Sequence, residues 1–161
     1  MNIRLAKLDD LKKIIDIERL CFPPLEAASE ESIHRRFQTF PENFIVAEEN
    51  GEVIGFINGC TSSFPTLTDE LYDNCLLHNV QGDYQMVFGL DVLEEYRCQG
   101  VGYALMIYFI DLMKSRDKKA IVLTCKDHLI HYYEKFGFVH LGLSQSQYGN
   151  TKWNDMILKL K

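Results

Sequence analysis

The chain of 161 residues lacks the features that mark membrane, secreted and repeat proteins. It contains no run of about twenty apolar residues, so nothing in it predicts a membrane-spanning helix. The start, Met1–Leu5, has no hydrophobic segment of the signal-peptide kind. Internal repeats, low-complexity segments and linkers rich in proline, glycine and serine are also absent. We therefore expect one domain over residues 1–161, long enough to bury a sizeable core.

Cysteine pairs of the C-x-x-C type are missing as well, and the number of cysteines is odd. The pattern therefore argues against a zinc site and against a disulfide framework. We expect reduced thiols packed as small apolar groups, a cytoplasmic location and no metal site. The five cysteines are Cys21, Cys60, Cys75, Cys98 and Cys125.

An excess of basic residues is the next absence. The formal net charge is −6 at pH 7 and the isoelectric point is about 5.3. Nucleic-acid-binding domains are usually basic, so we expect no nucleic-acid partner. A phosphate held by backbone N–H groups needs no basic surface, and an acidic chain attracts cationic small molecules at long range.

Apolar periodicity predicts an alternation of short strands and helices. The pair Asn50-Gly51 predicts a tight hairpin. The polar stretch 62–83 has at most one helical turn, near Leu71–Leu76, and a loop of that length is usually functional or mobile. The predicted strands are Asn2–Ala6, Phe44–Glu48, Glu52–Thr61, Tyr84–Leu93, 120–125, Val139–Leu143 and Trp153–Leu160. The predicted helices are Asp9–Leu20, Ser29–Phe40 with Ser29 as its cap, 101–115 and 127–136. The order β-α-α-β-β-β-α-β-α-β-β predicts an α/β fold with a mixed sheet.

The most informative stretch is Leu90–Gly102, an apolar run that leads into the turn Arg97-x-x-Gly100-x-Gly102 and then into a strong helix former. Backbone N–H groups at a helix start lack intrahelical partners and lie at the positive end of the helix dipole, so they suit a phosphate. Glycines let the phosphate approach the backbone closely. The turn matches neither a P-loop nor the dinucleotide G-x-G-x-x-G pattern, and ordinary turn chemistry is the alternative.

A second motif follows in residues 119–138. A short buried strand precedes a helix for which Asp127 is the expected N-cap and Gly137 the stop. The pair formed by Arg97-x-x-Gly100-x-Gly102 and Tyr133-x-x-x-Gly137-Phe138 resembles the GNAT superfamily of acetyl-CoA-dependent N-acetyltransferases. The resemblance runs over most of the chain. The segments 124–136 and 142–146 look most like the arylalkylamine (serotonin-type) acetyltransferases and their bacterial relatives.

The resemblance implies a mixed, largely antiparallel GNAT-like sheet whose central parallel strand pair is splayed to admit the pantetheine arm of acetyl-CoA, the co-substrate. It implies that the Leu90 N–H binds the oxyanion and that the Val92 backbone binds the pantetheine amides. Arg97 would orient the turn or meet a phosphate, with a solvated arginine as the alternative. Lys126 stands where many relatives have a CoA-contacting asparagine, and a phosphate contact is one option for it. The N–H groups implied for the pyrophosphate belong to Gln99, Gly100, Val101, Gly102 and Tyr103.

Acetyl transfer to an amine needs a proton for the departing thiolate, and Tyr133 is the expected general acid. A phenol with a pKa near 10 can protonate a thiolate whose conjugate acid has a pKa near 8.5. The resemblance places the tyrosine at this position near the CoA sulfur. The alternative is that Tyr133 only packs the helix, as its neighbour Tyr132 does.

The general base is not evident from the motifs. Serotonin-type enzymes carry two histidines on the strand before the glycine turn, where this chain has Met86 and Phe88, and neither can move a proton. His78 in the long loop has a suitable intrinsic pKa and is the candidate, with Asp83, Tyr84, Asp91 and a water chain as alternatives. A surface role for His78 is the other interpretation. Strand alternation places Asp91 on the opposite side from Leu90 and Val92, and Gly89 is a candidate for a bulge.

We expect a small-molecule amine N-acetyltransferase that works by direct attack in a ternary complex. An apolar corner at residues 22–25 and nearby acids would suit an aryl- or alkylamine, although a solvated acidic face explains the acids equally well. The alternatives are a protein or peptide acetyltransferase and a non-catalytic CoA-binding regulatory domain. The sequence identifies neither the amine nor the oligomeric state, and the resemblance leaves a homodimer open.

Overall fold

The computed structural model describes all residues from 1 to 161, as nine strands, five α-helices and short 3-10 turns. By their contacts the residues form two compact units, and each unit has a sheet of its own. The first unit comprises Met1–Gly59 and Phe88–Leu112, and the second comprises Cys60–Val87 and Met113–Lys161. The single domain expected from the sequence stays a prediction.

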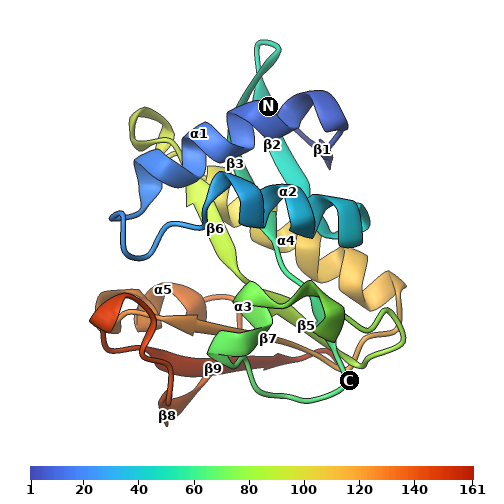
Figure 1. Ribbon diagram of the computed structural model, residues 1–161, viewed down its shortest axis with the longest axis vertical. Helices are drawn as coiled ribbons and strands as arrows, with labels where there is room; N and C mark the ends of the chain where they lie inside the picture. Colours follow the sequence, from blue (N-terminus) through green and yellow to red (C-terminus); the bar gives the residue numbers. More distant parts are fainter. The chain divides into compact units, whose positions relative to one another are not determined.

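The first unit holds an antiparallel sheet in the order β1-β2-β3-β6. Helices α1 and α2 run side by side across one face of this sheet, and α4 lies on the other (Figure 1). The elements are β1 (Asn2–Leu5), α1 (Leu11–Cys21), α2 (Glu30–Thr39), β2 (Ile45–Glu49), β3 (Glu52–Asn58), β6 (Gly89–Val92) and α4 (Val101–Ser115), whose last residues belong to the second unit.

Local sequence explains these elements. The apolar stripe of α1, with Ile14 and Ile17 fully buried, faces the sheet. Ser29 caps α2 by accepting a hydrogen bond from Ser32 N–H at 3.1 Å, as its spacing predicts. Asn50 and Gly51 both have positive φ, 51° and 80°, so the predicted hairpin is confirmed.

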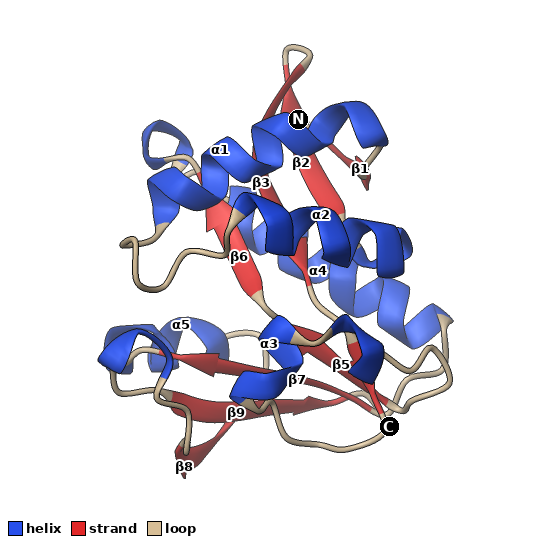
Figure 2. Ribbon diagram, viewed as in Figure 1, coloured by secondary structure: helices blue, strands red, loops and turns tan.

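The second unit holds a five-stranded sheet in the order β4-β5-β7-β9-β8, in which only β5 and β7 are parallel (Figure 2). Gly137, with a φ of 102°, follows α5 and ends the helical segment, as the sequence predicts. The elements are β4 (Thr61–Ser62), α3 (Asp69–Asp73), β5 (Tyr84–Val87), β7 (Ala120–Cys125), α5 (Ile130–Glu134), β8 (Val139–Leu143) and β9 (Asn154–Lys159).

The predicted strand Tyr84–Leu93 is wrong as a single element. Up to Val87 the chain pairs with β7, and from Gly89 it pairs with β3. Phe88 lies at the change, where its N–H donates to Asn58 O at 2.7 Å. The mixed fold with one central parallel pair is the one expected, and the parallel pairing ends at this point.

Three smaller expectations are also corrected. The predicted helix 127–136 is a 3-10 turn, Asp127–Leu129, followed by the short α5. Asp127 is not the N-cap, because its carboxylate accepts from Asn154 Nδ2 at 2.7 Å and Lys126 occupies the cap position. The loop near Leu71–Leu76 forms α3 and a 3-10 turn at Cys75–Leu77, so it is more ordered than predicted.

At Phe88 and Gly89 the strand has one residue more than its partner, because Phe88 N–H donates to Asn58 O while Gly89 is the register partner of the same Asn58. The bulge for which Gly89 is a candidate is therefore confirmed.

Candidate functional site

The edge of β6 offers backbone donors. This strand is the last in its sheet, with β3 on one side only. Leu93 N–H donates to Ile54 O on β3 at 3.0 Å, and N–H directions alternate along an antiparallel strand, so Asp91 N–H points to β3 as well. The N–H groups of Leu90 and Val92 therefore point away from β3. These are the two positions that the sequence assigns to the oxyanion and the pantetheine amides.

The glycine turn leads directly into α4. Gly100 O accepts from Ala104 N–H at 3.0 Å, so the helix begins immediately after Gly100 and the N–H groups of Val101 and Gly102 lie in its first turn, where no carbonyl precedes them within the helix. Gly100 has a φ of +86° and no heavy atom within 4 Å of an added Cβ, so the turn leaves open space beside its backbone. Its neighbour Cys98 is exposed and also has positive φ, at 60°. This arrangement fits a pyrophosphate.

The turn is tied to β6 through Arg97. Its Nε donates to Val92 O at 2.9 Å, and the thiol of Cys21 donates to the same oxygen at 3.4 Å. Burial raises the pKa of the Cys21 thiol, so the sulfur keeps the proton that it donates. Gln99 Nε2 donates to Glu95 O at 3.0 Å and closes the turn from the other end. The geometry therefore supports an orienting role for Arg97.

Tyr133 lies in the second unit and is buried, with 8% of its surface exposed. Its ring meets those of Tyr132 and Phe138 edge-on, with centroids 5.2 and 5.8 Å away. Burial raises the pKa of the neighbouring Tyr132 phenol. A phenylalanine at position 133 would keep these ring contacts.

Lys126 is held in place by its neighbours on both sides. Asn154 Nδ2 donates to Cys125 O at 3.2 Å and to Asp127 Oδ1 at 2.7 Å. The Lys126 ammonium lies 5.9 Å from the ring centroid of Trp153, within the range of a cation–π contact. The Lys126 side chain therefore has Trp153 as a defined neighbour. The bond between Asn154 and Asp127 fixes the turn that carries Lys126.

His78 anchors the long loop to β4. Its Nδ1 accepts a hydrogen bond from Thr61 N–H at 3.0 Å, and Thr61 Oγ1 donates to Gln85 Oε1 at 2.9 Å. The Nδ1 lone pair is thus already used within the fold. Taking up a proton there would break the bond to Thr61, which weighs against a role as general base.

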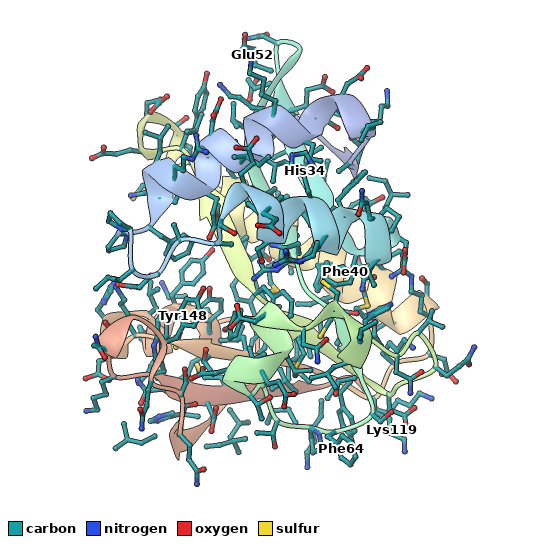
Figure 3. The ribbon with its side chains drawn as sticks, viewed as in Figure 1. His34, Phe40, Glu52, Phe64, Lys119 and Tyr148 are labelled. Atoms are coloured by element: carbon teal, nitrogen blue, oxygen red, sulfur yellow. The ribbon has the colours of Figure 1, made fainter.

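The rest of the loop packs on the segment between β8 and β9. The carboxylate of Asp69 accepts from Ser146 Oγ and, at 3.0 Å, from Gln147 N–H. Tyr72 stacks on Tyr148 with ring centroids 5.1 Å apart, and Figure 3 labels Tyr148 on that segment. The long loop 62–83 is therefore an ordered structure fixed to this segment.

A buried pair of acids in the first unit was only partly foreseen. Asp91 on β6 is 1% exposed and Glu18 on α1 is 6% exposed. The sequence puts Asp91 opposite Leu90 and Val92, and the burial alternation along β6 confirms this. Glu18 was missed, although its place one turn after Ile14 on the apolar stripe of α1 is the signal that could have found it.

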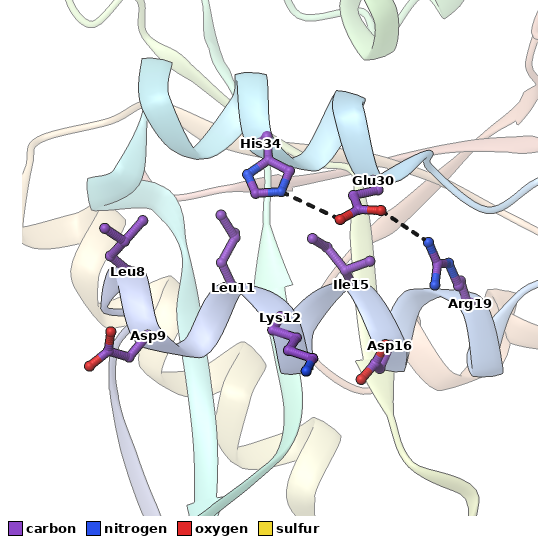
Figure 4. A pocket seen from close by; sticks show the side chains of 9 residues that line it. All are labelled: Leu8, Asp9, Leu11, Lys12, Ile15, Asp16, Arg19, Glu30 and His34. Carbon is purple, nitrogen blue, oxygen red and sulfur yellow. Dashed lines mark hydrogen bonds and ion pairs between the residues drawn. The ribbon is translucent and has the colours of Figure 1, made fainter.

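A surface groove lies between α1 and α2 in the same unit (Figure 4). Glu30 bridges His34 and Arg19 across it, with ion-pair distances of 3.8 and 3.3 Å. These side chains are about half exposed or more, and none belongs to the predicted site. No three His, Cys, Asp or Glu side chains gather so as to hold a metal ion, and no helix has the length and apolar character to cross a bilayer.

Comparisons with known proteins agree with this architecture. The model of the acetyltransferase (GNAT) family matches residues 11–138. The chain is 28% identical over 140 residues to the probable hydrolase YhcX of Bacillus subtilis (strain 168), covering 83% of this chain and 27% of that protein. It therefore spans about a quarter of that relative.

Two further relatives are named for acetyl transfer. The serotonin N-acetyltransferase of Mesocricetus auratus is 28% identical over 156 residues, covering 94% of this chain and 74% of that protein. The N-alpha-acetyltransferase of Sulfurisphaera tokodaii (strain DSM 16993 / JCM 10545 / NBRC 100140 / 7) is 27% identical over 160 residues, covering 92% and 86%.

Among solved structures, the GNAT-like decarboxylase GphF in complex with isobutyryl-CoA superimposes with a TM-score of 0.84, at 19% identity and 100% coverage of both chains. This likeness shows the fold. Since the family model spans most of the sequence, the chain belongs to the acetyltransferase (GNAT) family.

Proposed function

We propose that the protein transfers an acetyl group from acetyl-CoA to the primary amine of a small molecule by direct attack in a ternary complex. The observation that carries the proposal is the edge of β6, where the Leu90 and Val92 N–H groups point away from β3 and the chain runs on into the glycine turn and α4. Backbone donors in this order suit an acyl-pantetheine arm followed by a pyrophosphate.

Each backbone group has a role in this proposal. The Leu90 N–H stabilises the oxyanion that forms at the thioester carbonyl, and the Val92 N–H holds a pantetheine amide. The N–H groups of Gln99 to Tyr103 bind the pyrophosphate, with Gly100 and Gly102 leaving room for it. Because Val92 O accepts from Arg97 and Cys21, a pantetheine donor there would share or displace these bonds. Lys126 supplies a cation for a phosphate.

Tyr133 protonates the departing thiolate in this proposal, by virtue of its position in the family motif. The amine itself must first lose a proton, because an alkylammonium has a pKa of about 10 and only about 0.1% is free at pH 7. His78 is the candidate to take that proton, at the cost of its bond to Thr61, and water leading to bulk solvent is the alternative.

The amine is proposed to be an aryl- or alkylamine, supported by the similarity to a serotonin N-acetyltransferase. The histidine pair of serotonin-type enzymes has no counterpart, since Met86 is fully buried and the Phe88 ring lies 4.6 Å from the Arg36 guanidinium. The proton must therefore leave by a different route from that of serotonin-type enzymes, and the acceptor is expected to differ from serotonin in detail.

A peptide or protein N-terminus is the second candidate acceptor. The observation that favours it is the similarity to an N-alpha-acetyltransferase, which covers 92% of this chain. A non-catalytic CoA-binding domain is the third interpretation, favoured by the absent histidine pair.

The deciding experiment measures thiol release from acetyl-CoA with arylalkylamines, polyamines, aminoglycosides, amino acids and short peptides as acceptors. Acetyl-CoA binding is measured in parallel by calorimetry. Turnover with amines alone supports the proposal, and turnover with peptides alone favours the second candidate. Binding without turnover on any acceptor favours the non-catalytic interpretation, and absence of binding contradicts the proposed site.

A further inference from the structure

Glu18 and Asp91 bring two carboxyl groups together inside the first unit. A Cβ added to Gly89 would lie 2.8 Å from Asp91 Oδ1 and 3.6 Å from Glu18 Oε1, so both oxygens border the same glycine. Any side chain at this position would collide with the Asp91 carboxyl group. Gly89 therefore makes room for the acid pair.

The hydrogen bonds of the pair are unequal. Glu18 Oε2 accepts from Ala28 N–H at 2.8 Å, which ties the segment between α1 and α2 to the end of α1. Neither oxygen of Asp91 has a donor within the fold. A buried carboxylate without a donor is costly, and two carboxylates side by side repel each other. A single proton between the two groups removes both costs, because it makes Asp91 the donor and Glu18 the acceptor.

The surrounding charges agree with one shared proton. Burial raises the pKa of Asp91 well above its ordinary value, and the neighbouring Glu18 raises it further. Cys21 on α1 acts in the same direction, whereas Arg36 on α2 lowers it. The residue opposite Asp91 on β3 is Phe56, which cannot ionise. The positive charge of Arg36 therefore acts on the pair, and one such charge can balance one negative charge.

We propose that Asp91 carries a proton that it donates to Glu18, and that this carboxyl pair positions the segment 22–29, which contains the apolar corner 22–25 expected to suit the amine. The role in amine binding rests on the proposed function. The pair lies on the side of β6 opposite Leu90 and Val92, so it acts on the acceptor through segment 22–29 and touches neither substrate. Both acids are thus positioning residues.

The proposal predicts how the Michaelis constant for the amine changes with pH. As the pH rises through the raised pKa of Asp91, the second carboxyl group ionises, the pair repels and the tie to Ala28 weakens. The Michaelis constant for the amine should then increase on the alkaline side. Deprotonation of the amine itself lowers the Michaelis constant as the pH rises, because more of the amine is then in the reactive neutral form.

The test uses Asp91→Asn, Asp91→Leu and the control Asp16→Asn, which changes an exposed acid on α1, the helix that carries Glu18. Asparagine donates to Glu18 but cannot ionise, whereas leucine leaves Glu18 with only the donor from Ala28 N–H. At pH 7 Asp91→Asn should keep the amine KM within about twofold and abolish its alkaline increase. Asp91→Leu should raise that KM about tenfold, with the Kd for acetyl-CoA unchanged. Asp16→Asn should alter none of these values.

Two readouts need no turnover and so separate this proposal from the proposed function. Infrared spectroscopy should show the C=O band of a protonated carboxyl group at pH 7, and Asp91→Asn should lack it. Amide hydrogen exchange in segment 22–29 should be faster in Asp91→Leu than in the control. If the wild type lacks the band, or if Asp91→Asn exchanges as fast as Asp91→Leu, the proposal is wrong even where acetyl transfer is found. If no acceptor is acetylated, the proposed function fails while these two measurements still decide the state of the pair.

Discussion

The candidate residues differ in kind between the two units. In the first unit the proposed groups are backbone N–H groups at Leu90, Val92 and the start of α4, and β6 is the last strand of its sheet. In the second unit the proposed group is one side-chain hydroxyl, that of Tyr133, whose ring packs against Tyr132 and Phe138. A backbone site depends on topology and tolerates changes of side chain, whereas a side-chain site depends on the identity of one residue. Substitutions should therefore have opposite patterns in the two units.

The largest effect is expected for Tyr133→Phe. Loss of a general acid should lower kcat about 10²- to 10⁴-fold, because the thiolate then leaves without a proton. The Kd for acetyl-CoA should stay the same, and the ring contacts with Tyr132 and Phe138 remain. Tyr132→Phe is the matched control and should keep full activity. An unchanged kcat in Tyr133→Phe would remove the assignment of the general acid.

The second effect concerns the backbone of β6. Leu90→Pro removes the N–H that points away from β3 and should lower kcat about 10²- to 10³-fold, while Leu90→Ala keeps it and should be active. Met86→Pro in β5 is the contrasting variant. It deletes a donor to Cys60 O, 2.8 Å away inside the sheet, and should cost at least about 1–3 kcal/mol of folding stability. Equal loss of activity in Leu90→Ala would mean that the side chain matters and would break the contrast between the units.

The third effect compares two glycines with similar backbone angles. Gly100 and Gly51 have φ of +86° and +80°, and neither has a neighbour within 4 Å of an added Cβ. Alanine at either position should cost about 1–2 kcal/mol of strain, measured by denaturant unfolding. Only Gly100→Ala should also weaken acetyl-CoA binding, by about tenfold, because its Cβ lies in the phosphate turn. Similar calorimetric affinities for the two variants would contradict the pyrophosphate assignment.

The smallest effect is in stability at acid pH. Arg4 donates two hydrogen bonds to the Asp10 carboxylate, at 2.8 and 3.0 Å, and this pair lowers the pKa of Asp10. A carboxyl group whose pKa is lowered by folding stabilises the folded state at pH values above its ordinary pKa. This stabilisation is lost as the pH falls through the lowered pKa. Urea unfolding of Asp10→Asn should show a loss of about 1 kcal/mol at pH 7 and a smaller loss near pH 3. A difference from the wild type that does not change with pH would exclude this charge effect.

Local signals gave reliable predictions where the chemistry is contained in a few neighbouring residues. Asn50-Gly51, the Ser29 cap and the Gly137 stop are all confirmed, because each depends on a backbone angle or a bond within one turn. The turn Arg97–Gly102 precedes α4 as its sequence indicates. The roles of the individual site residues stay predictions.

Pairing between distant segments could not be predicted in this way. The change of sheet at Phe88 depends on which strands offer partners, and the apolar run 84–93 gives no sign of it. Asp127 looks like a cap until Asn154, 27 residues away, competes for its carboxylate. Likewise Glu18 resembles a surface acid on α1 until Asp91, from a strand more than 70 residues later, is placed beside it.

The outer edge of β6 bears on the stability and abundance of the protein in the cell. An unpaired strand edge is a template for association with other chains, and here it is only four residues long and is followed at once by a 3-10 turn. A pantetheine arm lying along it would take the place of a missing strand. Because a ligand that binds only the folded state stabilises it by RT ln(1 + [L]/Kd), resistance to heat and to proteolysis would follow the concentration of acetyl-CoA. Abundance of the enzyme would then depend on the supply of its own co-substrate.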